Sequence, residues 1–113
     1  LWDEEGPYIV PMSYGYRWDV GGLKLYFHCA AEGRKLDALR HNPRAAFEMD
    51  AGYEVIGSES ACDYTCAYMS VTGAGMLRVV ERPQEACEAL TCLMRRQTSR
   101  AMSLQISIRT LWF

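Results

Sequence analysis

The pattern of hydrophobic and polar positions predicts a β-hairpin near the start of the chain. Pro7 to Trp18 is dense in β-branched and aromatic residues, which favour strands. Asp19 to Gly22 contains the glycines that a reversal needs, and Leu23 to Cys29 reads as the return strand. A period of two divides that strand into two faces. The first face carries Leu23, Leu25 and Phe27, and the second carries Lys24, Tyr26 and His28. We expect the first face to suit the core and the second to be available to a ligand.

The following segment changes from strand period to helical period and back. Leucines three apart predict a short helix over Ala30 to Asn42, which Pro43 ends because proline cannot continue a helix. Arg44 to Asp50 returns to alternation and predicts a further strand. Ala51 to Asp63 is rich in Gly, Ser and Glu, so we expect it to be a connection.

The second half of the chain predicts a long strand followed by a helix. Tyr64 to Val80 reads as the strand, in which Gly73 and Gly75 suggest a bulge or a close backbone approach. Pro83 marks a helix start, since proline suits the first helical position and apolar residues follow at helical spacing. Short turns between neighbouring strands require antiparallel pairing. The predicted fold class is therefore mainly β (α+β), an antiparallel sheet or barrel with peripheral helices.

Composition narrows the class of protein. The 113 residues suffice for one domain, and 50% hydrophobic with 23% charged residues is ordinary for a soluble globular protein. A net charge of −2 argues against nucleic acid as a partner, and no apolar stretch reaches the roughly 20 residues that span a bilayer. The absence of a leader-like opening favours the cytoplasm. The five cysteines are then expected to be buried thiols rather than a disulfide framework.

The passage from Tyr26 to Lys35 carries the sharpest candidate chemistry. A strand leads there into a helix, whose first backbone amides favour an anion such as phosphate. Gly33 permits close approach, while Arg34 and Lys35 supply positive charge. The alternative interpretation is that Arg34 and Lys35 are a solvated pair on an exposed turn, as most surface cations are.

Histidine and cysteine positions give weaker candidates. His28 is a candidate catalytic group, because its ordinary pKa lies near neutrality; the alternative is a strand histidine paired with a backbone group. The spacing of Cys62 and Cys66, and that of Cys87 and Cys92, does not match paired zinc ligands, so no metal is expected. A thiol nucleophile at Cys29 would need an orienting partner that the sequence does not identify.

Four phrases resemble the pyridoxamine 5′-phosphate oxidase-like family, most closely its 5-nitroimidazole resistance (Nim) branch. They are GPYIVPMSYGY, LYFHCAAEGRKLDALRHNPRAAFEMD, ACDYTCAYMSVTGAG and ALTCLMRRQT, and the resemblance extends from about Leu1 to Gln97. It implies a split β-barrel that dimerises and holds FMN at the subunit interface. It also implies an FMN-dependent oxidoreductase that acts on a small molecule such as a nitro-aromatic, with a nicotinamide as possible reductant. Relatives of this barrel accept a deazaflavin or haem as well, and that choice stays open.

The resemblance also implies a set of cofactor-binding residues. The segment expected to line the flavin ring comprises Val10, Pro11, Met12 and Ser13. The residues expected around the ribityl chain and phosphate are Phe27, His28, Cys29, Gly33, Arg34 and Lys35. Tyr68 and Ser70 are weaker candidates, which would approach from the partner chain.

The ends of the chain depart from the family pattern. We expect residues 1–98 to form the FMN-binding domain, without the usual first helix and strand, and residues 99–113 to be a divergent tail in which Leu104 to Ile108 alternates like a strand. The barrel would then be incomplete at both ends. This leaves a second hypothesis, a non-catalytic or degenerate barrel that binds a flavin or another ligand without turning it over.

Overall fold

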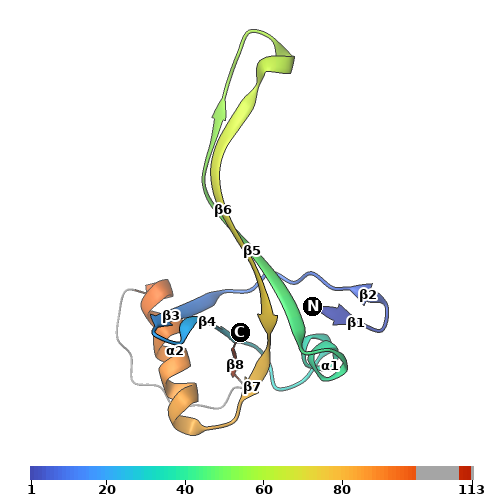
Figure 1. Cartoon of the computed structure of the whole chain (residues 1–113), viewed down its shortest axis with the longest axis vertical. Coiled ribbons are helices and arrows are strands. Elements are labelled where there is room, and N and C mark those ends of the chain that lie inside the picture. Colours follow the sequence, from blue (N-terminus) through green and yellow to red (C-terminus); the bar gives the residue numbers. More distant parts are fainter. Residues whose placement is uncertain (99–109, 113) are drawn as a thin grey trace.

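Antiparallel strands and two helices make up the computed structural model, which describes residues 1–98 and 110–112 (Figure 1). The elements are, in chain order, β1 (Trp2–Asp3), β2 (Gly6–Pro7), β3 (Tyr14–Asp19), β4 (Gly22–His28), α1 (Arg34–His41), β5 (Arg44–Ile56), a 3-10 turn η1 (Ala61–Asp63), β6 (Thr65–Met76), β7 (Arg78–Val80), α2 (Pro83–Thr98) and β8 (Thr110–Trp112). The predicted mainly β class with antiparallel pairing is confirmed.

Within residues 1–98 and 110–112 the strands form three separate sheets. One has four strands in the order β3-β4-β8-β7, and the other two are the pairs β1-β2 and β5-β6. Every pairing between these strands is antiparallel. Among the described residues no sheet closes into a barrel, so barrel closure stays a prediction. The expected strand from Leu104 to Ile108 lies outside the described residues.

The β3–β4 hairpin forms where the sequence predicts it. Asp19 pairs with Gly22, which leaves Val20 and Gly21 as a two-residue loop. The Asp19 carboxylate accepts a hydrogen bond from the Gly21 backbone amide at 2.8 Å, and Gly22 has a φ of 100° that suits glycine. The first strand is shorter than predicted, however. Only its second half from Tyr14 pairs with β4, and residues 8–13 cross the molecule outside any strand.

Helix α2 covers one face of the β3–β4 hairpin. Its Ala89, Leu90 and Leu93 form a core cluster with Tyr26, which is 1% exposed. The prediction that the Tyr26 face of β4 is available to a ligand is therefore wrong at Tyr26. A period of two separates the faces of a strand but does not say which face a distant helix will cover.

Gly15 brings β3 and α2 into backbone contact. A Cβ atom built on Gly15 would lie 2.4 Å from the Leu93 amide nitrogen and 2.5 Å from the Cys92 carbonyl carbon. Contacts under 3.0 Å with backbone atoms cannot be relieved by turning a side chain. Because Gly15 has no side chain, α2 can lie directly against the β3–β4 hairpin. This close packing buries Tyr26 between the two.

Helix α1 starts later than predicted and anchors a second core cluster. Ala30 to Gly33 precede it, and Gly33 sits at the N-cap with a φ of 121°, a conformation that side chains disfavour. Leu36 and Leu39 then pack against Cys29 and Leu77. This cluster joins α1 to the end of β4 and to the start of β7.

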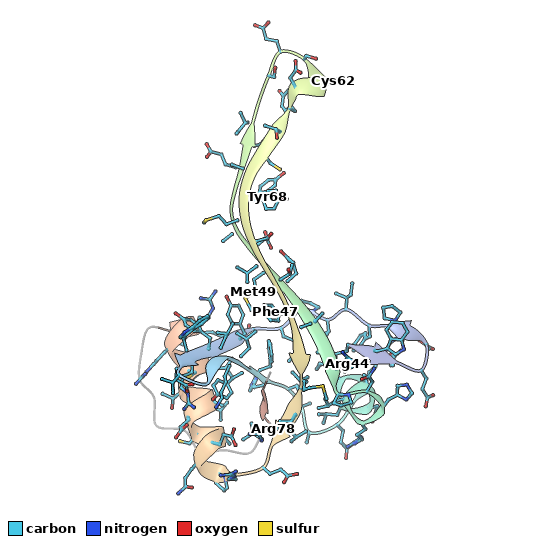
Figure 2. The ribbon with its side chains drawn as sticks, in the orientation of Figure 1. Arg44, Phe47, Met49, Cys62, Tyr68 and Arg78 are labelled. Carbon is cyan, nitrogen blue, oxygen red and sulfur yellow. The ribbon has the colours of Figure 1, made fainter. Side chains whose placement is uncertain are left out.

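Strands β5 and β6 form a long hairpin that projects from the rest of the molecule, whose longest extent is 57 Å (Figure 1). Every residue from 50 to 72 is exposed, and we call these residues the arm. Figure 2 shows Phe47 and Met49 at the base of the arm, Tyr68 along its length and Cys62 near its tip. The predicted connection over Ala51 to Asp63 is wrong in its first half, because Tyr53, Val55 and Ile56 extend β5 opposite β6.

Candidate functional site

A cleft of about 550 Å³ lies at the base of the arm, and its lining includes Lys35 of α1 and Arg96 of α2. Five of the twelve predicted cofactor-binding residues line it, namely Val10, Pro11, Met12, Phe27 and Lys35. Phe47 and Met49 of β5 add apolar surface, while Glu48 and Asp50 add carboxylates. The volume falls within the range of about 300 to 1,000 Å³ that small-molecule sites occupy.

The segment Ile9 to Ser13 offers unpaired backbone groups beside this cleft. No hydrogen bond to the backbone of these residues is found within the described part of the chain, although Tyr8 donates to the Leu1 carbonyl just before them. Val10, Pro11 and Met12 line the cleft, and Ser13 is exposed beside it. Backbone N–H and C=O groups that have no partner favour a ligand with a polar edge.

Lys35 supplies positive charge at the α1 side of the cleft. It is half-buried, and no ion pair or hydrogen bond of its ammonium is found among the described residues. The space above Gly33 is open, since a Cβ built there meets nothing within 4 Å. The first turn of α1 and Lys35 therefore present an accessible site for an anion.

Arg34 is engaged elsewhere in this structure. Its guanidinium donates to Asp3 at 2.7 Å and to Glu5 at 3.3 Å, and it lies 4.4 Å from the centre of the Tyr8 ring. The Arg34 hydrogen bond holds the pKa of Asp3 below its ordinary value. Arg34 thus fastens the β1–β2 hairpin to α1, immediately before the segment that lines the cleft. Its predicted phosphate contact stays a prediction.

His28 and Cys29 lie outside the cleft lining. His28 is exposed and, by alternation along β4, lies on the opposite face from Phe27. Cys29 is 8% exposed in the α1 core cluster, and burial raises the pKa of its thiol, with the charge of Lys35 opposing that shift. A protonated buried thiol is a poor nucleophile. The catalytic role of His28 and the cofactor contacts of both residues stay predictions.

Tyr68 and Ser70 are on the arm and face solvent. Tyr68 is 60% exposed, and Ser70 pairs with Asp50 across the hairpin. Neither lines the cleft of its own chain. Any role in cofactor binding therefore requires a second copy of the chain, as the prediction assumed.

Arg96 and Tyr14 are among the cleft residues that the sequence did not single out. Arg96, from the last turn of α2, has its guanidinium carbon 4.3 Å from the centre of the Tyr14 ring, and both residues line the cleft. A cation at a helix C-terminus is expected from the helix dipole alone, so nothing in the sequence distinguished Arg96 from its neighbour Arg95.

The ring of Phe47 depends on a glycine of the opposite strand. Phe47 pairs with Gly73, and a Cβ built on Gly73 would lie 2.5 Å from two carbon atoms of that ring. The prediction of a bulge or a close backbone approach at Gly73 is wrong, because the strands pair in register there and the close contact is with a side chain. Gly73 gives Phe47 the room to lie across the hairpin at the edge of the cleft.

Gly73→Ala is expected to push the Phe47 ring toward the cleft and to weaken about tenfold the FMN binding that the family resemblance implies, a loss of about 1.4 kcal/mol. The added methyl cannot share the space that the ring occupies. Titration of FMN by fluorescence quenching measures the effect. With Phe47→Leu in place, adding Gly73→Ala should cost little further affinity, because no ring is left to displace; if Gly73→Ala alone binds as the parent does, the ring does not shape the cleft.

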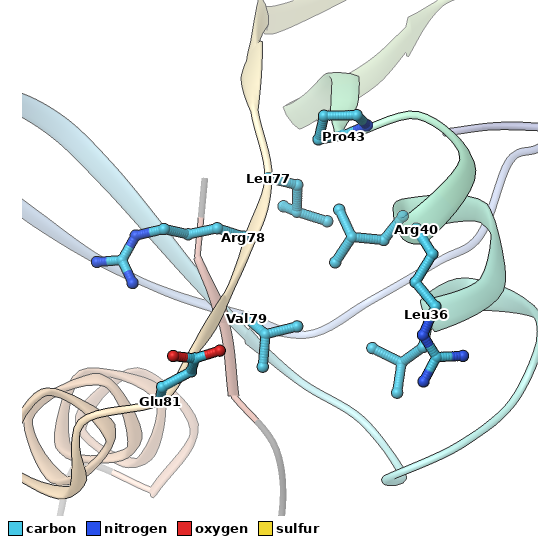
Figure 3. A pocket seen from close by; sticks show the side chains of 8 residues that line it. Leu36, Arg40, Pro43, Leu77, Arg78, Val79 and Glu81 are labelled. Atoms are coloured by element: carbon cyan, nitrogen blue, oxygen red, sulfur yellow. The ribbon is translucent and has the colours of Figure 1, made fainter.

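A second hollow of about 440 Å³ lies between α1 and β7 (Figure 3). Leu36, Leu77 and Val79 form its apolar part, with Arg40 and Glu81 at its edge. None of the predicted site residues lines it. Among the described residues no group of three or more His, Cys, Asp or Glu side chains could hold a metal ion, and no helix is long and apolar enough to cross a membrane.

Comparison with known proteins identifies the family. Residues 1–108 match the family model of pyridoxamine 5′-phosphate oxidase, so the chain belongs to that family. Its structure is similar to the crystal structure of a protein from Bacteroides thetaiotaomicron VPI-5482, described as a candidate 5-nitroimidazole antibiotic resistance protein. That similarity has a TM-score of 0.75 and 25% sequence identity, and covers 97% of this chain and 72% of the other. No curated protein matches.

Proposed function

We propose that this chain is a flavoprotein that binds FMN in the cleft at the base of the arm and transfers electrons to or from a small molecule such as a nitro-aromatic. The cleft is the observation that supports the proposal. Its apolar walls suit the faces of the flavin ring, its unpaired backbone segment suits the polar edge of that ring, and Lys35 suits the phosphate. Membership of the pyridoxamine 5′-phosphate oxidase family supports a flavin. The similar structure described as a candidate 5-nitroimidazole resistance protein supports a nitro-aromatic substrate.

The residues of the chain have distinct tasks in this proposal. Met12, Phe27 and Phe47 would contact the faces of the flavin ring, and the backbone of Ile9 to Ser13 would bond its polar edge. Lys35 would neutralise the phosphate. The bound flavin would supply the hydride or single-electron chemistry, so no protein nucleophile is needed. His28 lies outside this cleft, so the proposal gives it no proton transfer there, and its catalytic role stays a prediction from the sequence.

A homodimer is part of the proposal, and the composition of the arm supports it. Seven large apolar side chains of the arm are at least half exposed, namely Tyr53, Val55, Ile56, Tyr64, Tyr68, Met69 and Val71. An isolated two-stranded hairpin is marginally stable in water, so such a surface needs a partner.

Charge favours a second copy of this chain as that partner. The arm contains four acidic residues and no Lys or Arg, whereas all 12 Lys and Arg and the other ten acidic residues lie elsewhere, which gives the rest of the chain a net charge of +2. The arm of one copy is thus attracted to the body of another. In a two-fold dimer each copy would both give and receive an arm.

The purified chain is expected to be yellow, or to become yellow with added FMN, and to be bleached by a nicotinamide reductant. Visible absorption checks both steps. Absence of a bound chromophore after FMN is supplied would exclude a flavoprotein. A yellow protein that no nicotinamide bleaches, but dithionite does, would support the alternative, a domain that carries flavin without turning it over.

Lys35→Met is expected to weaken FMN binding roughly 10- to 100-fold, which is the effect of losing one charge-assisted contact. Riboflavin, which has no phosphate, should bind the variant and the parent alike. Lys24→Met is the matched control, because Lys24 does not line the cleft. Equal losses for FMN and riboflavin would show that Lys35 supports the cleft rather than the phosphate.

A further inference from the structure

Arg96 differs from most other arginines of the described chain in what it contacts. Arg17, Arg34, Arg40 and Arg78 each form an ion pair with a carboxylate. No such pair is found for Arg96 within the described residues; its guanidinium lies instead over the Tyr14 ring. A guanidinium on an aromatic ring keeps its N–H edge available for an anion.

The position of Arg96 gives the cleft two separate cations. Lys35 comes from α1 and Arg96 from α2, and these helices lie on opposite sides of β5 (Figure 1). The lining between them is largely apolar, from Val10, Met12 and Phe27. Consider a ligand that has a phosphate at one end and an apolar ring at the other. If its phosphate lies at Lys35, its ring extends toward Arg96.

We infer that Arg96, held over Tyr14, faces the ring of the bound flavin and favours its reduced form. This inference rests on the proposed function. Uptake of two electrons and one proton from an added reductant leaves the flavin ring with one negative charge at neutral pH, whereas the oxidised ring has none. A nearby guanidinium stabilises only the charged form, so it raises the affinity for reduced flavin relative to oxidised flavin.

The geometry explains why a helix residue takes this position. Gly15 lets α2 contact β3 directly, and Tyr14 is the next residue of the same strand. The close packing therefore brings the last turn of α2 over the strand that enters the cleft. Tyr14 restricts the long Arg96 side chain by stacking, which reduces the entropy lost when it meets a ligand.

The test compares the reduction potential of FMN bound to the parent with that of FMN bound to Arg96→Gln, with dithionite as reductant and a reference dye. The parent is expected to prefer reduced over oxidised FMN about tenfold more strongly than Arg96→Gln does. Arg96→Lys should keep much of that preference. Arg95→Gln removes the same charge from the neighbouring residue, which does not line the cleft, and should leave the potential unchanged.

Binding of FMN and riboflavin in their oxidised forms separates the remaining outcomes. Arg96→Gln should bind both with nearly the affinity of the parent. A loss confined to FMN would place the phosphate at Arg96 and overturn the inference, as would a potential equal to that of the parent. Failure of the parent itself to bind FMN would overturn the proposed function together with this inference.

Discussion

Gly15→Ala is expected to destabilise the protein by about 3 kcal/mol or more, at the upper end for a buried small-to-large substitution. The new methyl would meet backbone atoms of Cys92 and Leu93, so only a displacement of α2 from the sheet can relieve the clash. That displacement would open the cluster around Tyr26, which is 1% exposed. Chemical denaturation followed by circular dichroism measures the change in the unfolding free energy.

Gly57→Ala is the control for the substitution at Gly15. A Cβ on Gly57 makes only ordinary contacts of 3.6 to 3.7 Å with the Tyr64 ring, and we expect a change within about 0.5 kcal/mol. Because α2 also carries Arg96, any Gly15→Ala protein that folds should lose the stacking of Arg96 on Tyr14. A variant with parental stability would mean that hairpin and helix do not touch at Gly15.

Elements with strong local signals could be predicted from the sequence. The reversal between Asp19 and Gly22 needs glycine at a positive φ, and the helix that begins at Pro83 has a proline at its first position. Both features act within a few residues. The resemblance of the chain to the pyridoxamine 5′-phosphate oxidase family is also confirmed.

Features that depend on distant contacts could not be predicted. Tyr26 is buried by a helix some 60 residues later, which the alternation along β4 does not reveal. The extension of β5 to Ile56 was hidden because polar residues and glycines surround its exposed apolar ones. An arm without a core of its own lacks the regular burial pattern on which strand prediction relies.

The candidate site shows the same division. Residues close together in sequence, such as Val10 to Met12, lie beside one another in the cleft, and their contact with a flavin ring stays a prediction. The walls from β5 and the cation from α2 meet them only through the tertiary fold. Arg34 shows how a local motif can mislead. Its sequence neighbours predict a phosphate contact, but in this structure its guanidinium pairs with Asp3 and Glu5, about 30 residues earlier.

Shortening the arm is expected to abolish the proposed homodimer at micromolar concentration and to weaken the proposed FMN binding at least tenfold. In the variant, an Asn-Gly turn would replace residues 52–68 and join Ala51 to Met69, which already pair across the hairpin. The removed residues are all exposed, so the remaining monomer should stay folded. Sedimentation velocity and FMN titration measure the two losses, and thermal unfolding verifies the fold.

A charge variant tests how the arm acts without shortening it. Glu54→Lys, Glu59→Lys and Asp63→Lys together reverse the charge of the arm and keep its apolar side chains, so the arm should be repelled by the positively charged body of a second copy. Dimerisation should weaken most at low salt and recover as salt screens the repulsion.

A shortened chain that remains dimeric with parental FMN affinity would contradict the role of the arm. Loss of the dimer with FMN affinity intact would place the whole cofactor site within one copy.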